Sequence, residues 1–323
     1  MAAVDVEFNE RIDLTTFEFT DIELSLNGVP IQLDNRVSVT LLAGTVYRIS
    51  GLSPFTGQEG QYTLAVKGSD PVEGTVIVDL DGNPAVGSAS TTWTMDPTSP
   101  QVIEVVEVEP DPRNTPVSYI DVIFSEEIDL TTFTWEDLEL LRDGEPVTLD
   151  DTVAISWISG TTYRISNLSG FTGLAGSYEL RVYGTGVTDP ATNVGTGIAT
   201  DTWVMDLTGP QVTDVIDVTP DPRNMPVAAV EVVMSELIDI DTFTFEDITL
   251  TRDGSDVPLG PAVAVSHVSG TTYRIEGLTN FTDVEGDYVL TVEAGQIQDI
   301  AGNFGTNSGS DAWTMDLTAP QVV

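Results

Sequence analysis

One ten-residue pattern occurs three times in this chain of 323 residues, and it limits what the chain can fold into. Each copy begins with Trp-x-Met-Asp and ends with Pro-Gln-Val, and the tryptophans, Trp93, Trp203 and Trp313, lie 110 residues apart. A period of that length is too long for a solenoid repeat and suits a whole domain. Apolar and polar side chains alternate along the chain up to the Met and again after the Pro. Each copy therefore predicts a last strand, a short linker and the first strand of the next domain.

The repeat divides the chain into predicted domains at residues 1–97, 98–207 and 208–318, with 319–323 beginning a further first strand. The third copy matches the second without a gap. The first copy has six extra residues between Tyr62 and Trp93, which we place in the segment 68–81. It also has no counterpart of the first strand, so domain 1 is predicted to lack that strand. Truncation of a longer array and a natural chain end explain this equally well.

The complete second repeat contains about seven short alternating segments, separated by turn signals, and no useful helical period. In the segment 117–124, Ile120, Val122 and Phe124 form the expected core face. A strand is also expected over 134–141, before a hairpin turn at Asp143-Gly144. We expect the repeated aromatic residues, Tyr178 and Trp203 among them, to lie in a core. This pattern predicts an all-β chain of two-sheet sandwiches.

The charge of the chain excludes several classes of partner. There are 52 acidic and 11 basic residues, and the net charge is −41. Nucleic acids and anionic membrane surfaces would be repelled, and no apolar run is long enough to insert into a membrane. Two purposes remain for so many acids: binding of divalent cations, or hydration at high salt, as in a halophile's surface protein. The chain has no cysteine, which excludes disulfides and thiolate metal sites.

Several motifs resemble those of bacterial Ig-like domains found in surface-layer proteins and large adhesins. They are Phe124-Ser-Glu126 with Ile128-Asp129, Gly160-Thr-Thr-Tyr163, Asp299-Ile-Ala-Gly-Asn303 and the linker Asp316-Leu-Thr-Ala-Pro320. The resemblance implies three tandem Ig-like β-sandwich domains, the first lacking its first strand. It also implies an extracellular, multi-domain stalk or filament at the cell surface, a type of protein often stiffened by Ca²⁺. Ig-like modules serve many purposes, so these motifs specify the fold better than the function.

Acidic side chains from three loops are expected to gather at one pole of a sandwich, next to the incoming linker. Ca²⁺ is bound by about 6 to 8 oxygen atoms from carboxylates, amides and carbonyls. Without a cation, such a gathering would raise the pKa values of the carboxyls and cost stability, unless the loops splay apart. Turn preference alone also explains Asp and Asn at these positions. The candidate Ca²⁺ ligands are Asp96, Glu126, Asp129, Asp189 and Asn193 in repeat 2, and Asp206, Glu236, Asp239, Asp299 and Asn303 in repeat 3.

Catalysis is not expected. His267 is the only histidine and lies at a strand position that Trp157 occupies in repeat 2, and no phosphate-binding loop or histidine metal motif is present. The sequence therefore predicts a structural or adhesive segment of a cell-surface protein. Its domains either continue a longer repeat array or join head to tail through an unpaired strand edge of domain 1. The alternatives are a carbohydrate-binding module of a secreted enzyme, with surface glycans as partners, and a halophile protein whose acids serve hydration alone.

Overall fold

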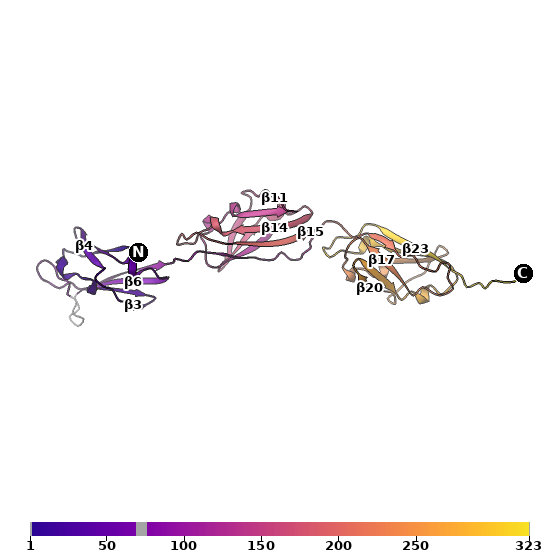
Figure 1. Cartoon of the computed structure of the whole chain (residues 1–323), viewed down its shortest axis with the longest axis horizontal. Coiled ribbons are helices and arrows are strands. Elements are labelled where there is room, and N and C mark those ends of the chain that lie inside the picture. Colours follow the sequence, from indigo (N-terminus) through magenta and orange to yellow (C-terminus); the bar gives the residue numbers. More distant parts are fainter. Residues whose placement is uncertain (1, 69–75, 323) are drawn as a thin grey trace. The chain divides into compact units, whose positions relative to one another are not determined.

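The computed structural model describes residues 2–68 and 76–322, and all of its sheets are antiparallel (Figure 1). The chain divides into two compact units. The first contains residues 1–101 together with the loops 125–132 and 184–196, and the second contains 102–124, 133–183 and 197–323. No helix in the described part of the chain is long and apolar enough to cross a membrane.

Two sheets form the sandwich of the first unit. One has three strands in the order β1, β5, β4, and the other has four in the order β3, β2, β6, β7. The predicted absence of a first strand is confirmed. The sheets of the second unit that correspond to the three-stranded sheet have a fourth strand at the edge. The strands are β1 (Ala3–Glu7), β2 (Ile22–Leu26), β3 (Val29–Ile31), β4 (Ser38–Ala43), β5 (Val46–Ser50), β6 (Gly60–Lys67) and β7 (Ser88–Met95).

The second unit contains two complete sandwiches of two four-stranded sheets each. The second repeat has the sheets β12-β13-β9-β8 and β11-β10-β14-β15, and the third has β20-β21-β17-β16 and β19-β18-β22-β23. The strands are β8 (Val102–Val105), β9 (Tyr119–Phe124), β10 (Leu138–Arg142), β11 (Glu145–Val147), β12 (Ala154–Ser159), β13 (Thr162–Ser166), β14 (Gly176–Tyr183), β15 (Ile198–Met205), β16 (Val212–Val215), β17 (Ala229–Met234), β18 (Ile248–Arg252), β19 (Ser255–Asp256), β20 (Ala264–Ser269), β21 (Thr272–Glu276), β22 (Gly286–Glu293) and β23 (Ser308–Met315).

The chain thus forms three tandem Ig-like sandwiches, one for each repeat, which we call the first, second and third sandwich. The predicted boundaries at 97/98, 207/208 and 318/319 stay a prediction. Part of the six-residue insertion also remains untested, because residues 69–75 lie outside the described residues.

Local sequence explains the strand pattern. On β9, the predicted core residues Ile120, Val122 and Phe124 are buried. The expected hairpin turn joins β10 to β11, with Asp143 and Gly144 at φ 54° and 83°. These positive φ values explain why Asp-Gly is found there, since Gly adopts them freely and Asp tolerates them.

The alternation predicts one strand over 134–141, and this prediction is wrong. Trp135–Asp137 forms a 3-10 helix, and β10 starts only at Leu138. The reason is a capping box: the Asp137 carboxylate accepts the Thr134 amide, and the Thr134 hydroxyl accepts the Glu136 amide. Such single turns recur, at Leu14–Thr16, Phe19–Asp21, Ser53–Phe55, Leu130–Thr132, Leu168–Gly170, Gly184–Gly186, Ile240–Thr242, Phe245–Asp247, Thr279–Phe281 and Ala294–Gln296.

A stacked aromatic pair lies in each sandwich. Trp203 on β15 pairs with Tyr178 on β14, and their ring centroids are 5.3 Å apart. Both side chains are about 1% exposed, so the predicted core role is confirmed. The Tyr178 hydroxyl also donates to the Leu174 carbonyl at 2.9 Å, so this tyrosine ties down a corner as well. The equivalent pairs are Tyr62 with Trp93 and Tyr288 with Trp313.

A short parallel pairing closes the second sandwich near its C-terminal end. Arg113 forms a parallel bridge with Met205. The Arg113 amide donates to the Val204 carbonyl at 3.0 Å, and the Asp206 amide donates to the Arg113 carbonyl at 2.8 Å. In the third sandwich, Arg223 makes the same two bonds, with Thr314 and Asp316.

Candidate metal centres

Two carboxylate clusters occur at matching positions in the described part of the chain. In each, three side chains offer carboxylate oxygens that lie within 4.8 Å of one another. One acid comes from the linker after a closing strand, one from the loop after the second strand of a complete sandwich, and one from the loop before the next closing strand. The first cluster is Asp96, Glu126 and Asp189, within the first unit, and the second is Asp206, Glu236 and Asp299, within the second unit.

The most buried acid of each cluster is held by an Asn four residues later. Asp189 is 1% exposed, and its two oxygens accept the Asn193 backbone amide at 2.8 Å and the Asn193 Nδ2 at 2.7 Å. Asp299 is 3% exposed and is bound by Asn303 in the same way, at 2.8 Å in both bonds. The Asp-x-x-x-Asn spacing therefore builds a closed turn that keeps one carboxylate out of water.

The same asparagines attach the linkers. Asn193 Nδ2 donates to the Asp96 carbonyl at 2.9 Å, and Asn303 Nδ2 donates to the Asp206 carbonyl at 3.0 Å. The Asp96 side chain in turn accepts the Thr98 amide at 3.1 Å and hydroxyl at 2.7 Å. This explains the Asp-x-Thr motif, which bends the linker so that its acid faces the pole of the following sandwich.

Burial and mutual repulsion raise the pKa of one acid in each cluster. For Glu126, desolvation raises the pKa most, followed by the negative charge of Asp96; Asp189 adds to the effect, and the Thr98 hydroxyl opposes it. For Glu236, desolvation again comes first, followed by Asp206 and Asp299. The ionised clusters are thus destabilised as they stand, and a cation between the oxygens would reverse this effect.

Three of the five predicted ligands in each repeat come together as carboxylates, and a fourth, Asn193 or Asn303, supports them. The structure does not bring Asp129 and Asp239 into the clusters. Asp129 accepts the Thr131 amide at 3.0 Å and hydroxyl at 2.7 Å, and these bonds lower its pKa. Asp239 caps the 3-10 helix Ile240–Thr242. Asp96 binds Thr98 in the same way and still lies in its cluster, so the position of the turn, and not its hydrogen bonds, keeps Asp129 outside.

The donors fit a hard divalent cation. Carboxylate, amide and carbonyl oxygens are the ligands that Ca²⁺ prefers, and neither cluster contains histidine or cysteine. In the first cluster, Asp96, Glu126 and Asp189 would hold the ion, and the Asn193 side chain would position the buried carboxylate. The ion would supply positive charge where three carboxylates repel one another.

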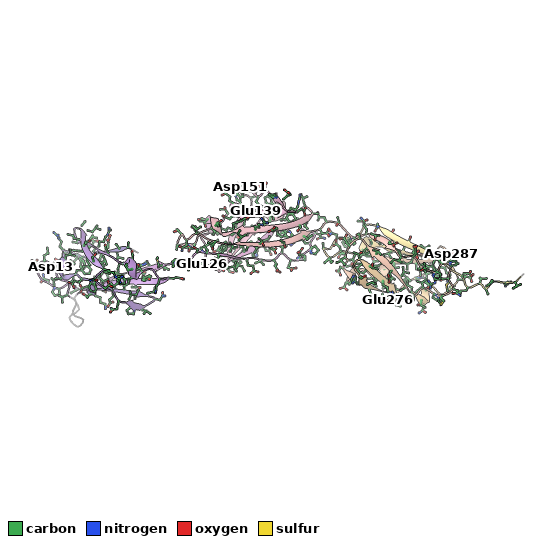
Figure 2. The ribbon with its side chains drawn as sticks, in the orientation of Figure 1. Asp13, Glu126, Glu139, Asp151, Glu276 and Asp287 are labelled. Carbon is green, nitrogen blue, oxygen red and sulfur yellow. The ribbon has the colours of Figure 1, made fainter. Side chains whose placement is uncertain are left out.

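Among the described residues, acidic side chains elsewhere do not form such clusters. Figure 2 shows them over strands and loops alike, with Glu139 and Glu276 among those labelled. Some of them are paired with arginines. Arg181 contacts Glu139 and Glu179, and its guanidinium helps to lower the Glu139 pKa, after the Tyr183 hydroxyl. These exposed pairs contribute little to stability.

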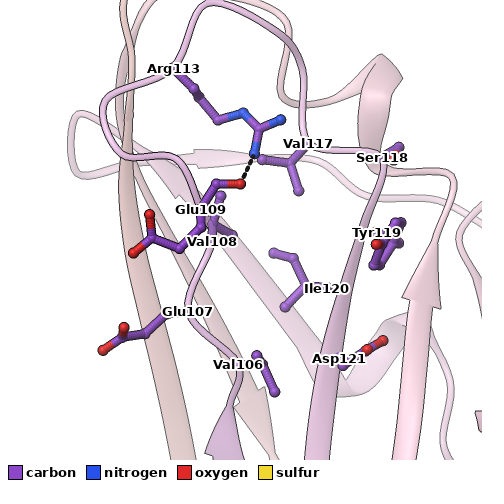
Figure 3. Close-up of a pocket in the computed structure, with 10 residues that line it drawn as sticks. All are labelled: Val106, Glu107, Val108, Glu109, Arg113, Val117, Ser118, Tyr119, Ile120 and Asp121. Carbon is purple, nitrogen blue, oxygen red and sulfur yellow. Dashed lines mark hydrogen bonds between the residues drawn. The ribbon is translucent and has the colours of Figure 1, made fainter. Parts of the chain in front are cut away.

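A surface pocket of the second sandwich contains arginine, acid and aromatic side chains but no cluster of potential ligands (Figure 3). Arg113 donates to the Glu109 carbonyl at 3.4 Å at its edge. Tyr119 is half exposed, but the Arg164 guanidinium lies over its ring at 3.8 Å and covers one face. His267 is exposed, and its Nε2 lies 2.9 Å from the Gly270 carbonyl oxygen of its own hairpin.

No family model matches the chain, and no curated protein matches it. Several solved structures can be aligned with it. A titin I-band fragment, I67–I69, is 13% identical, with 92% of this chain and 88% of that chain covered and a TM-score of 0.30. Titin domains A168–A170 are 11% identical, with 98% and 100% covered and a TM-score of 0.32. The N-terminal part of the bacterial S-layer protein SbsC is 11% identical, with 68% and 44% covered and a TM-score of 0.23. TM-scores this low do not support a fold assignment by themselves. The Ig-like assignment therefore depends on the sheets described above.

Proposed function

We propose that this chain is a non-catalytic structural and adhesive segment of an extracellular cell-surface protein or filament, and that Ca²⁺ binds at its two carboxylate clusters. The observation that supports the cation is the repeated gathering of three carboxylates within 4.8 Å, one of them almost fully buried. Bringing like charges together is unfavourable, and an ion offsets the repulsion. Each cluster includes an acid of the linker, so a bound ion ties the linker to the next pole and stiffens it.

The test is thermal unfolding in chelator, in CaCl₂, and in NaCl of matched ionic strength. We expect CaCl₂ to raise the melting temperature above the NaCl value. A free ion concentration of one hundred times the Kd adds about 2.7 kcal/mol per site. Such a gain corresponds to a rise of several degrees for domains of this size. Equal stabilisation by NaCl would instead support the halophile alternative, in which the acids serve hydration.

Two variants with the same chemical change make the test specific. The double variant Glu126→Gln, Glu236→Gln removes one charge from each cluster and keeps an acceptor oxygen on a side chain of the same length. It should lose the Ca²⁺ effect and should be no less stable than the parent in chelator, because repulsion is relieved. The control, Asp129→Asn with Asp239→Asn, alters acids in neighbouring turns outside the clusters and should keep the Ca²⁺ effect. If both variants respond to Ca²⁺ alike, the clusters are not the binding sites.

The carbohydrate-binding alternative has less support. Stacking on sugars requires exposed aromatic faces side by side, whereas Trp203 and Trp313 are 1% and 2% exposed and stack on tyrosines inside the sandwiches. The exposed Trp157 and Phe304 belong to different sandwiches and form no such platform. We therefore propose a role in which the sandwiches carry load and present surface, and in which copies of the chain associate with one another.

A further inference from the structure

The first sandwich has an open edge where the other two have a strand. In the second sandwich β8 pairs with β9 and lies against β15, and in the third β16 pairs with β17 and lies against β23. Among the described residues, nothing pairs with the outer edge of β1, which corresponds to β9 and β17.

Matched positions show what this opening exposes. Val122 and Val232 are fully buried, whereas Val6 at the same position is only half-buried. Trp203 is 1% exposed, whereas Trp93 is half-buried. The same difference separates Val4 from Ile120 and Val230, Phe8 from Phe124 and Met234, and Met95 from Met205 and Met315.

Buried and half-buried apolar side chains line the floor of a groove between β1 and β7. One end is formed by Val4, Val6, Leu64, Val66 and Ala89. The groove continues past Phe8 towards Ala85 and Val86. In the complete sandwiches the valines of β8 and β16 occupy this place, with Val102 at 7% and Val212 at 6% exposure. The groove therefore fits a strand with the sequence pattern of the chain's own first strands.

The beginning of such a strand is present and uncovered at the other end of the chain. Residues 316–322, Asp-Leu-Thr-Ala-Pro-Gln-Val, repeat the linker 206–212 with one change, Ala for Gly. Pro210 and Val212 are buried, whereas Pro320 is exposed and Val322 is fully exposed. The Asp-x-Thr bend is already formed, because the Asp316 carboxylate accepts the Thr318 amide at 2.8 Å.

We propose that residues 316–322 of one copy of this chain dock on the open edge of the first sandwich of a second copy. The register follows from the second sandwich, where Val102 lies opposite Phe124 and the Ser125 amide donates to the Gln101 carbonyl. Val322 then lies opposite Phe8 of the second copy, and the Asn9 amide donates to the Gln321 carbonyl. Main-chain bonds supply affinity, and the apolar groove selects the valine.

The acidic pole of the first sandwich is also prepared for this linker. Asp79 accepts the Asn83 backbone amide at 2.8 Å and Nδ2 at 2.7 Å, as Asp189 does with Asn193. Asp79 is half-buried where Asp189 is 1% exposed, because no linker covers it. Docking brings Asp316 of the other copy to Asp79 and Glu10, which completes a third cluster of the same composition. The inference rests on the proposed structural role, but the strand pairing itself does not require a cation.

Two residues oppose the docking, one in the tail and one in the first sandwich. A Cβ added at Gly209 would collide with the Phe304 carbonyl oxygen, and Ala319 holds this position in the tail. The linker 96–102 has Ser99 there, so the docked tail must follow the path of that linker rather than that of 206–212.

A Cβ added at Gly195 would lie 3.1 Å from the Pro100 carbonyl oxygen, and one at Gly305 would lie 2.7 Å from that of Pro210. Ala85 occupies this position in the first sandwich. The linker must shift by a few tenths of an ångström there, so Ala85→Gly should tighten the association.

The experiment is sedimentation velocity on the full chain over a concentration series up to about 1 mM, since so short a segment buries less surface than a stable interface needs. We expect self-association that increases with concentration. Val322→Asp should weaken it at least about tenfold, because the valine is buried on docking. The control is Leu317→Asp, which adds the same charge in the same tail. Its counterpart Leu207 stays 47% exposed in a docked linker, so association should persist.

Each outcome decides the matter. A chain that stays monomeric at about 1 mM, both as the parent and as Ala85→Gly, overturns the proposal. Equal loss for Val322→Asp and Leu317→Asp also overturns it, because general repulsion would then explain the effect. Repeating the series in chelator separates the two proposals. Association that persists there while CaCl₂ fails to raise the melting temperature supports strand docking alone, and the reverse result supports the cation alone.

Discussion

At the scale of single residues, Asp201 and Asp311 show how an acid can fasten a strand. Asp201 accepts the Val108 amide at 3.0 Å, and Asp311 accepts the Val218 amide at 2.8 Å. Burial raises the pKa of both carboxyls above the ordinary value, although these hydrogen bonds partly lower it. The two groups therefore bind protons more readily in the folded chain than in the unfolded chain.

The sign of the pH dependence follows. As the pH falls through the raised folded pKa towards the ordinary unfolded value of about 3.9, each group adds to the free energy of unfolding. Asp201→Asn with Asp311→Asn keeps the acceptor oxygens and should remove this gain. Urea unfolding between about pH 6 and 4 measures it. The control is Asp150→Asn, since the Thr152 hydroxyl lowers the Asp150 pKa and its contribution has the opposite sign. Parallel pH profiles for parent and double variant would contradict the prediction.

Which residues form the clusters could be predicted only in part. The repeat placed Asp96, Glu126 and Asp189 at one pole, because their loops alternate along the chain. It could not distinguish them from Asp129, which has the same residue type and spacing. A local hydrogen bond does not separate them either, because Asp96 accepts the Thr98 amide as Asp129 accepts the Thr131 amide. Which of these turns faces the other loops depends on how the sandwich packs, and only the coordinates show it.

At the scale of elements, the two-residue alternation identified β9 and β15 because both faces of these strands have distinct environments. The same alternation failed at Trp135–Asp137, where a capping box outweighs the strand pattern. The missing first strand was visible in the sequence as a missing copy of one segment. Its consequence, partial exposure of Val6 and Trp93, required coordinates, because exposure depends on what packs against a residue.

Hydrogen exchange should distinguish β1 from its counterparts. On β9 and β17 both edges are paired, so their amides should be protected, whereas the outward amides of β1 should exchange much faster. Mass spectrometry of peptides covering residues 2–8, 119–124 and 229–234 in dilute protein makes the comparison. The inner strands β5 and β13 serve as controls and should exchange alike. Slow exchange throughout β1 would show that another part of the chain covers the edge.

At the scale of the whole molecule, a net charge of −41 must oppose folding by self-repulsion. Raising NaCl from about 0.01 M to 1 M shortens the screening length from about 30 Å to 3 Å, and we expect the melting temperature to rise accordingly. The variant Glu126→Gln, Glu236→Gln should keep most of this rise, since it removes only two of 52 acids. A melting temperature independent of NaCl would mean that the charges are already neutralised by bound ions.

The parallel pairing of Arg113 with the end of β15 bears on how the second sandwich responds to tension. Force entering before β8 and leaving after β15 pulls these parallel segments in opposite directions along their length. The bonds of Arg113 with Val204 and Asp206 are then strained together rather than opened one at a time. The first sandwich, whose described residues include no such pairing, should be the first to extend under the same pull. Residues 316–322 contain no counterpart of Arg113, so a docked tail would leave this sandwich the weakest of the three.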